Sequence, residues 1–266
     1  MKQVKAKILS NEQVAPRYFK MRLASPYLAK NLQPGQFIEV RCSDGVDPLL
    51  RRPFGPHRIL ASRGMFEMLY EVVGKATIVL SNKRAGEELD IIGPLGNGFT
   101  PEKQAIIVGG GIGIAPLLAL AEKICNGKKT GLRAVIGART KGALLCEKDF
   151  KKLGAKVAVM TDDGSYGKKG FATDALKTLL ATNDEQRTTI YACGPRQMMQ
   201  AVAELSKEHH VKCQLLLEEY MACGVGVCLG CPVKVRKDLV DHEYKMVCKD
   251  GPVFDAQEIN WQKKGG

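Results

Sequence analysis

Residues 105–113 read Ala105-Ile106-Ile107-Val108-Gly109-Gly110-Gly111-Ile112-Gly113. The apolar residues predict a buried strand, the glycines predict a tight turn, and a helical pattern follows over residues 114–125. Because a strand, a glycine turn and a helix in this order let backbone N–H groups approach a pyrophosphate, Gly110, Gly111 and Gly113 are candidate dinucleotide contacts. A turn needed only for helix packing is the alternative.

The same rhythm continues over residues 101–212. Further strands are expected at 132–136, 156–160 and 189–192, and helices at 172–180 and 196–207. Strands that alternate with helices predict a doubly wound parallel α/β sheet.

The tripeptide Cys193-Gly194-Pro195 follows the last expected strand of this unit. Ligands bind at the carboxyl edge of such sheets, so these three residues are candidates for a ligand site. The alternative is a strand end with a buried cysteine, followed by a helix that begins at proline.

Residues 1–100 have a different pattern, in which short β-rich segments are separated by Gly and Pro. The clearest segments lie at residues 4–8, 18–23, 37–40 and 66–73. Alternating strands with frequent turns predict an antiparallel β-barrel. The complete chain is therefore expected to be an α+β multidomain protein.

Two segments of this N-terminal half are suited to anions. Arg51-Arg52-Pro53-Phe54-Gly55 combines guanidinium groups, which match phosphate oxygens, with an aromatic ring that can cover a flat ligand. Gly74-Lys75-Ala76-Thr77 offers a cation and a hydroxyl at the start of an expected helix. A solvated Arg pair beside a turn is the alternative for the first segment.

Four of the nine cysteines form a pattern near the C-terminus. Cys223, Cys228, Cys231 and Cys248 are separated by four, two and sixteen residues. This C-x4-C-x2-C spacing with a distant fourth Cys is the plant-type ligand pattern of a [2Fe–2S] cluster. Tetrahedral zinc remains an alternative, although structural zinc sites usually pair two C-x2-C units; disulfides or unrelated buried thiols are another.

Composition limits the class of protein. The chain has 266 residues, 45% of them hydrophobic, which is enough for two or three domains. No apolar run is long enough to cross a membrane and no signal-peptide core follows Met1, so a cytoplasmic location without membrane contact is expected. The net charge of +12 is spread in short Lys pairs without interleaved aromatic residues, which argues against a nucleic-acid partner.

Taken in order, these motifs resemble the ferredoxin reductase family. The resemblance includes Gly93-Pro94-Leu95-Gly96-Asn97-Gly98-Phe99 and covers nearly the whole chain. The cysteine segment that begins at Glu219 narrows the match to electron-transfer subunits of class 1B dihydroorotate dehydrogenases. In one departure, the family commonly has Ser or Thr where this chain has Gly55, which offers only its backbone N–H.

The resemblance implies three units, namely an FAD-binding barrel (1–100), an NAD-binding domain (101–212) and a [2Fe–2S] module (213–266). FAD would be bound by Arg52-Pro53-Phe54-Gly55 and Gly74-Lys75-Ala76-Thr77. NAD(H) would be bound by Gly110, Gly111, Gly113 and Cys193-Gly194-Pro195, with Cys193 near the nicotinamide ring. The cluster would be bound by Cys223, Cys228, Cys231 and Cys248. Flavin takes up two electrons and releases them singly, whereas the cluster carries one.

The resemblance also implies a partner. No part of the chain resembles a dihydroorotate site, so a separate FMN-containing catalytic subunit is expected, in a heterotetramer of two copies of each. One alternative is the flavin subunit of an NAD(P)H-dependent ferredoxin or sulfide oxidoreductase. Another is a non-catalytic redox-sensing or zinc-stabilised binding protein. NADH and NADPH are not distinguished by Arg139 and Lys141, which follow the second strand of the nucleotide domain.

Overall fold

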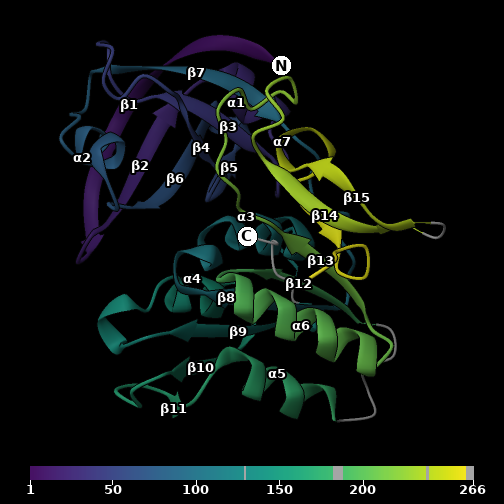
Figure 1. The fold of residues 1–266 in the computed structure, drawn as a ribbon. Helices are drawn as coiled ribbons and strands as arrows, with labels where there is room; N and C mark the ends of the chain where they lie inside the picture. The colour runs from purple at the N-terminus through teal and green to yellow at the C-terminus, as the bar shows by residue number, and fades with distance from the viewer. Residues whose placement is uncertain (129, 182–187, 238–239, 262–266) are drawn as a thin grey trace.

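The computed structural model describes residues 1–128, 130–181, 188–237 and 240–261. It contains an N-terminal antiparallel sheet, a central α/β domain and a C-terminal segment with a two-stranded hairpin (Figure 1).

The N-terminal sheet has seven strands in the order β4-β3-β7-β1-β2-β6-β5. Their bounds are β1 Lys2–Ala15, β2 Tyr18–Ala24, β3 Phe37–Arg41, β4 Arg52–Phe54, β5 Arg58–Leu60, β6 Met65–Glu71 and β7 Glu88–Leu95. The short helices α1 (Pro26–Asn31) and α2 (Lys75–Ser81) and the 3₁₀ turn η1 (Ala61–Arg63) connect them.

Chain connectivity requires this sheet to be curled. β4 and β5 lie at its opposite edges, yet only residues 55–57 separate them along the chain. Four Cα steps reach roughly 15 Å, whereas seven strands laid flat would be about 29 Å across. The expected barrel is therefore a curled antiparallel sheet whose two edge strands approach each other.

The central domain has a parallel sheet with strands in the order β11-β10-β9-β8-β12-β13, as expected for a doubly wound fold. Its strands are β8 Ala105–Gly110, β9 Arg133–Ala138, β10 Lys156–Thr161, β11 Lys168–Lys169, β12 Thr189–Cys193 and β13 Lys212–Leu216. Its helices are α3 Ile114–Cys125, α4 Glu147–Lys152, α5 Ala172–Leu180 and α6 Arg196–Glu208, with 3₁₀ turns η2 Gly111–Gly113 and η3 Lys141–Ala143.

The C-terminal segment is joined to the central sheet. It contains β14 (Pro232–Lys237), β15 (Val240–Met246), α7 (Val247–Asp250) and β16 (Val253–Asp255). β16 pairs antiparallel with β13 and forms the last strand of that sheet. The expected boundary at residues 212 and 213 falls at the start of β13, so the two C-terminal units share a sheet.

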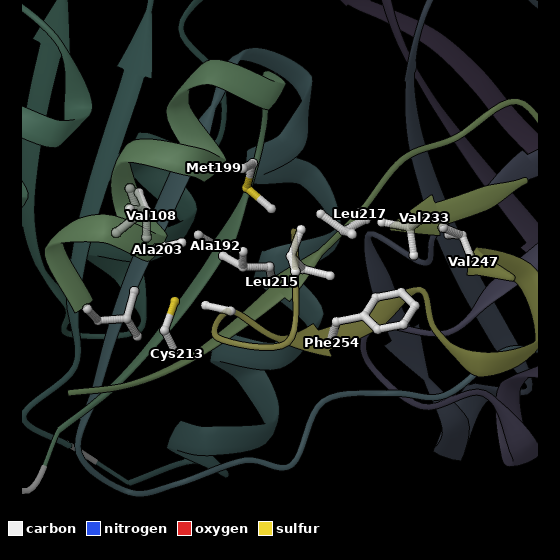
Figure 2. Packing of buried hydrophobic residues seen from close by; sticks show 14 of the residues in the cluster. Val108, Ala192, Met199, Ala203, Cys213, Leu215, Leu217, Val233, Val247 and Phe254 are labelled. Atoms are coloured by element: carbon white, nitrogen blue, oxygen red, sulfur yellow. The ribbon is translucent and has the colours of Figure 1, made fainter. Parts of the chain in front are cut away.

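Each face of the central sheet packs against a different neighbour. On one face, α3 and α4 form a core that includes Tyr18 and Leu69 of the N-terminal sheet. On the other, α5 and α6 share a core with the C-terminal segment, and this core includes Met199, Leu215 and Phe254 (Figure 2). Among the described residues, no helix is long and apolar enough to span a membrane.

Candidate functional site

A cleft with a volume of about 790 Å³ opens at the carboxyl edge of the central sheet. Its wall includes the turn after β8, Arg139 after β9, Asp162 after β10 and the segment Gly194–Met199 after β12. This is the switch-point edge at which doubly wound sheets bind ligands, and the volume suits a dinucleotide.

The three predicted glycines of the turn all line this cleft, but their environments differ. Gly111 has φ +56°, and a Cβ placed there would meet no atom within 4 Å, so its backbone faces open space. A Cβ at Gly113 would lie 2.5 Å from the backbone oxygen of Cys193. Gly111 therefore leaves room for a ligand, whereas Gly113 allows the start of α3 to approach β12.

The three residues of the predicted tripeptide after β12 differ in solvent exposure. Gly194 and Pro195 line the cleft, but the Cys193 side chain is fully buried beneath it. Its sulfur lies 4.0 Å from Oε1 of Glu218. Burial and the Glu218 carboxylate raise the pKa of Cys193 well above its usual value, so it is a neutral thiol.

A second cavity, with a volume of about 550 Å³, lies between the curled sheet and the central domain. The predicted segments Arg52–Gly55 and Gly74–Thr77 both line it, together with Tyr70. The Phe54 ring packs edge-to-face on Tyr70, with centroids 5.9 Å apart. A guanidinium group and two aromatic rings in one cavity fit the phosphates and the flat ring of a flavin dinucleotide.

The neighbouring arginines Arg51 and Arg52 have different roles. Arg51 donates through Nη2 to Oδ1 of Asp90 at 2.8 Å and through Nη1 to the Asp90 carbonyl at 2.8 Å, so it joins strands of the sheet. Arg52 donates through Nη1 to the Leu50 carbonyl at 2.6 Å and lines the cavity. Arg52 is therefore the guanidinium available to a ligand.

In the second segment, the Thr77 hydroxyl is already used by the backbone. It accepts from the N–H groups of Val73 and Gly74 at 2.9 and 3.1 Å and donates to the Gly74 carbonyl at 2.9 Å. Lys75 pairs with Asp47. The hydroxyl therefore shapes the turn, and the cavity-facing groups of this segment come from its backbone and from Lys75.

The two cavities share a wall. Leu216, Leu217, Glu218 and Glu219 line both of them, as do Glu71 and Ile112. The Glu218 side chain is exposed at the cavity surface, but the protein atoms around its carboxyl group partly exclude water and raise its pKa. Sequence reasoning missed Glu218; the only signal was an acidic residue directly after the apolar run that ends the sheet.

The chain leaves this wall and enters the cysteine loop. Tyr220 and Met221 line the second cavity, and Cys223 follows two residues later. The loop ends at Cys231, and Cys248 lies in α7 beside it: the Cys248 N–H donates to the Cys231 sulfur at 3.4 Å. The Gly226 N–H donates to the Cys248 sulfur at 3.1 Å. The fold thus places Cys248 beside the loop that carries the other three predicted ligands.

Backbone N–H groups point at the sulfurs in this loop. The Cys223 sulfur accepts from Val225 at 3.4 Å and from Cys228 at 3.5 Å, and the Cys228 sulfur accepts from Gly230 at 3.4 Å. Burial alone would raise the pKa of Cys223, but hydrogen bonds from Val225 and Cys228 lower it to about 6. Backbone dipoles directed at sulfur stabilise thiolates and cluster sulfides, so the loop fits an iron–sulfur group.

The described residues form no group of three or more His, Cys, Asp or Glu side chains placed to hold one metal ion. In a two-iron cluster the four cysteines are divided between the two irons, so this finding does not conflict with such a cluster.

Comparisons with known proteins agree with this geometry. Residues 107–204 match the oxidoreductase NAD-binding domain, and residues 218–260 match the iron-sulfur cluster binding domain of dihydroorotate dehydrogenase B. All four predicted cysteine ligands lie within the second match. The prediction of an iron–sulfur module over a zinc site is thereby confirmed, while the individual ligands stay predictions.

A solved structure reported as an NADH-dependent reduced ferredoxin-NADP oxidoreductase has a TM-score of 0.84 and 32% identity, over 97% of this chain and 90% of that one. A ferredoxin NADP+ reductase from Neisseria gonorrhoeae, at 16% identity and a TM-score of 0.65, shares the fold over 79% of this chain and 92% of its own. The protein is therefore a ferredoxin reductase-like oxidoreductase, as predicted.

Relatives in sequence narrow the class further. The electron transfer subunit of dihydroorotate dehydrogenase B (NAD(+)) from Desulforamulus reducens is 38% identical over 97% of this chain and 98% of its own length. The subunit of the same name from Caldanaerobacter subterraneus is 41% identical over 96% and 98%. The chain belongs to the family of dihydroorotate dehydrogenase B electron transfer subunits.

Proposed function

We propose that this chain relays electrons between NAD(H) and a catalytic dihydroorotate dehydrogenase subunit, in pyrimidine synthesis. NAD(H) would occupy the cleft of the central domain, FAD the second cavity, and a [2Fe–2S] cluster the cysteine loop. FAD held by Arg52–Gly55 and Gly74–Thr77 would supply the conversion between two-electron hydride chemistry and single-electron chemistry.

One observation carries this proposal. The segment Leu216–Glu219 lines both cavities, and the same segment continues past Tyr220 and Met221 into Cys223. Nucleotide cleft, flavin cavity and cysteine loop therefore meet along one short piece of chain. Such closeness is what transfer between three redox groups requires.

The surface around the cysteine loop supports docking of a redox partner. Cys228 is exposed, and so are Val227 and Leu229 on either side of it. Apolar side chains around an exposed ligand sulfur suit a protein interface. We propose that an FMN-containing catalytic subunit covers this surface in a heterotetramer of two copies of each chain.

We also propose a cytoplasmic location. All nine cysteines lie in the described ranges, and none forms a disulfide, which fits a reducing compartment.

Co-purification from the native cell tests the proposal. The complex should contain FAD, FMN and one two-iron cluster for each pair of subunits, and it should couple dihydroorotate oxidation to NAD+ reduction. Recovery of zinc without acid-labile sulfide would contradict the relay. Turnover with ferredoxin but not with dihydroorotate would favour the ferredoxin oxidoreductase alternative. The similarity to a solved ferredoxin-NADP oxidoreductase at 32% identity is the reason for testing it.

A further inference from the structure

The residues between the two edge strands of the curled sheet contact the central domain. Gly55 stands where the family commonly has a Ser or Thr hydroxyl, and it lines the flavin cavity. It also faces Pro116 of α3: a Cβ added at Gly55 would lie 3.1 Å from the Cβ of Pro116. Nδ1 of His57 lies 2.9 Å from the Ala115 carbonyl in the first turn of α3.

Arg58, at the start of β5, joins two helices of the central domain. Its Nε lies 3.2 Å from Oε1 of Glu122 in α3, and its Nη2 donates to Oδ1 of Asp149 in α4 at 2.8 Å. The Arg58 side chain is 29% exposed, so its ion pairs are partly shielded from water. The contact with Asp149 is a directed hydrogen bond, whereas the contact with Glu122 is an ion pair without hydrogen-bond geometry. A planar guanidinium can hold one carboxylate in a defined direction and still attract a second, which an ammonium group does less well.

His57 adds a directional contact beside this ion pair. It is 3% exposed, and burial lowers its pKa, so the ring is neutral. Because a carbonyl oxygen can only accept, Nδ1 carries the proton and donates it to Ala115. The contact therefore fixes the residue directly before β5 against the first turn of α3.

These contacts lie close to both cofactor cavities along the chain. Arg52–Phe54 of the flavin cavity immediately precede Gly55, and Gly111–Gly113 of the nucleotide cleft immediately precede α3. A shift of the curled sheet over α3 would therefore move one cavity relative to the other. Misplacement of reacting groups by about 1 Å can slow a reaction on the order of 100-fold.

We propose that Arg58, supported by His57, is a positioning residue that sets the flavin cavity against the nucleotide cleft and so controls hydride transfer between them. This inference rests on the proposed function. Arg58 contacts neither cavity in this role; it acts through the relative placement of two domains.

Arg58→Gln tests the proposal in the complete, cofactor-loaded protein. Lys151→Gln is the matched control, because Lys151 pairs with Glu147 at 2.6 Å inside α4 and links no domains. The measurements are FAD and iron content, affinity for NAD+, the rate of flavin bleaching by NADH without oxygen, the long-wavelength charge-transfer absorbance, and hydrogen exchange at the start of α3.

In Arg58→Gln, NADH should bleach the flavin at least about 10-fold more slowly than in the wild type, and the charge-transfer absorbance should be weaker. Cofactor content and NAD+ affinity should be unchanged. Exchange at the start of α3 should become faster. Arg58→Lys should be intermediate, and Lys151→Gln should match the wild type.

Wild-type rates in Arg58→Gln, or equal slowing in Lys151→Gln, would overturn the inference. If NADH failed to bleach the wild type, the proposed function would fail instead. The exchange comparison would then still decide whether Arg58 joins the domains.

Discussion

The carboxyl group of Glu39, in β3, lies directly against Gly224 of the cysteine loop. A Cβ added at Gly224 would be 2.6 Å from Cγ and 2.8 Å from Oε1 of Glu39, and Gly224 has φ +69°. The curled sheet therefore supports the loop beside the first cysteine ligand, at a place where only glycine fits.

Gly224→Ala should impair cluster binding, because the added methyl group must push the loop away from Glu39. We expect a lower content of iron and acid-labile sulfide per chain, with FAD content unchanged. Gly131→Ala is the control, since a Cβ there meets no atom within 4 Å. Equal cluster content in both variants would show that the contact does not position the loop.

Glu39→Gln should change how stability depends on pH. Glu39 is 1% exposed, neither carboxylate oxygen has a hydrogen-bond partner, and burial, only partly offset by Arg51, raises its pKa to about 7. The folded state therefore binds the Glu39 proton more tightly than the unfolded state does. The resulting contribution to the free energy of unfolding is fully present below pH 4.5 and is lost as pH rises through 7.

Wild type should therefore lose about 1 kcal/mol more than Glu39→Gln between pH 6 and 8.5, out of a total of about 3 kcal/mol. Thermal unfolding of the loaded protein at both pH values gives the comparison. Parallel curves for the two proteins would mean that Glu39 does not titrate in this range.

Glu218→Gln should slow flavin reduction by NADH about 10-fold or more, because Glu218 is a carboxyl on the wall shared by both cavities. The amide has a similar shape but cannot exchange a proton. Rapid-mixing absorbance without oxygen gives the rate, with Glu208→Gln, at the exposed end of α6, as the control. An unchanged rate with full FAD content would remove Glu218 from the reaction.

Cys228→Ser should separate the two halves of the relay. The substitution lies in the exposed part of the cysteine loop, away from both cavities. Bleaching of the flavin by NADH should persist, whereas electron delivery to the catalytic partner should stop. Undiminished coupled turnover with dihydroorotate and NAD+ would contradict the assignment of this cysteine to the electron path.

Local sequence patterns predicted much of the central domain. The helix expected over 114–125 is α3 and the helix over 172–180 is α5, each with the predicted ends. Short elements such as α4 and β16 were not expected, because six or three residues carry little periodic signal. Their stability comes from partners that are distant in the sequence.

Individual site residues show the same division. Phe99, the last residue of the motif Gly93–Phe99, is buried and packs edge-to-face on Tyr191, with centroids 5.6 Å apart. By contrast, Arg51 and Arg52 look equivalent in sequence, and only the position of Asp90 in β7, two strands away in the sheet, separates a structural arginine from a ligand-facing one. Hydrogen-bond partners of long side chains cannot be deduced from spacing.

The sequence alone determined the chemistry that this protein can support, because thiol spacing and glycine turns act over a few neighbouring residues. Tertiary structure decided where individual side chains lie: Glu218 lies between two cavities, Glu39 lies against Gly224, and Arg58 connects two domains. These relationships join segments tens to nearly two hundred residues apart, and burial, shifted pKa values and distances exist only after the chain has packed.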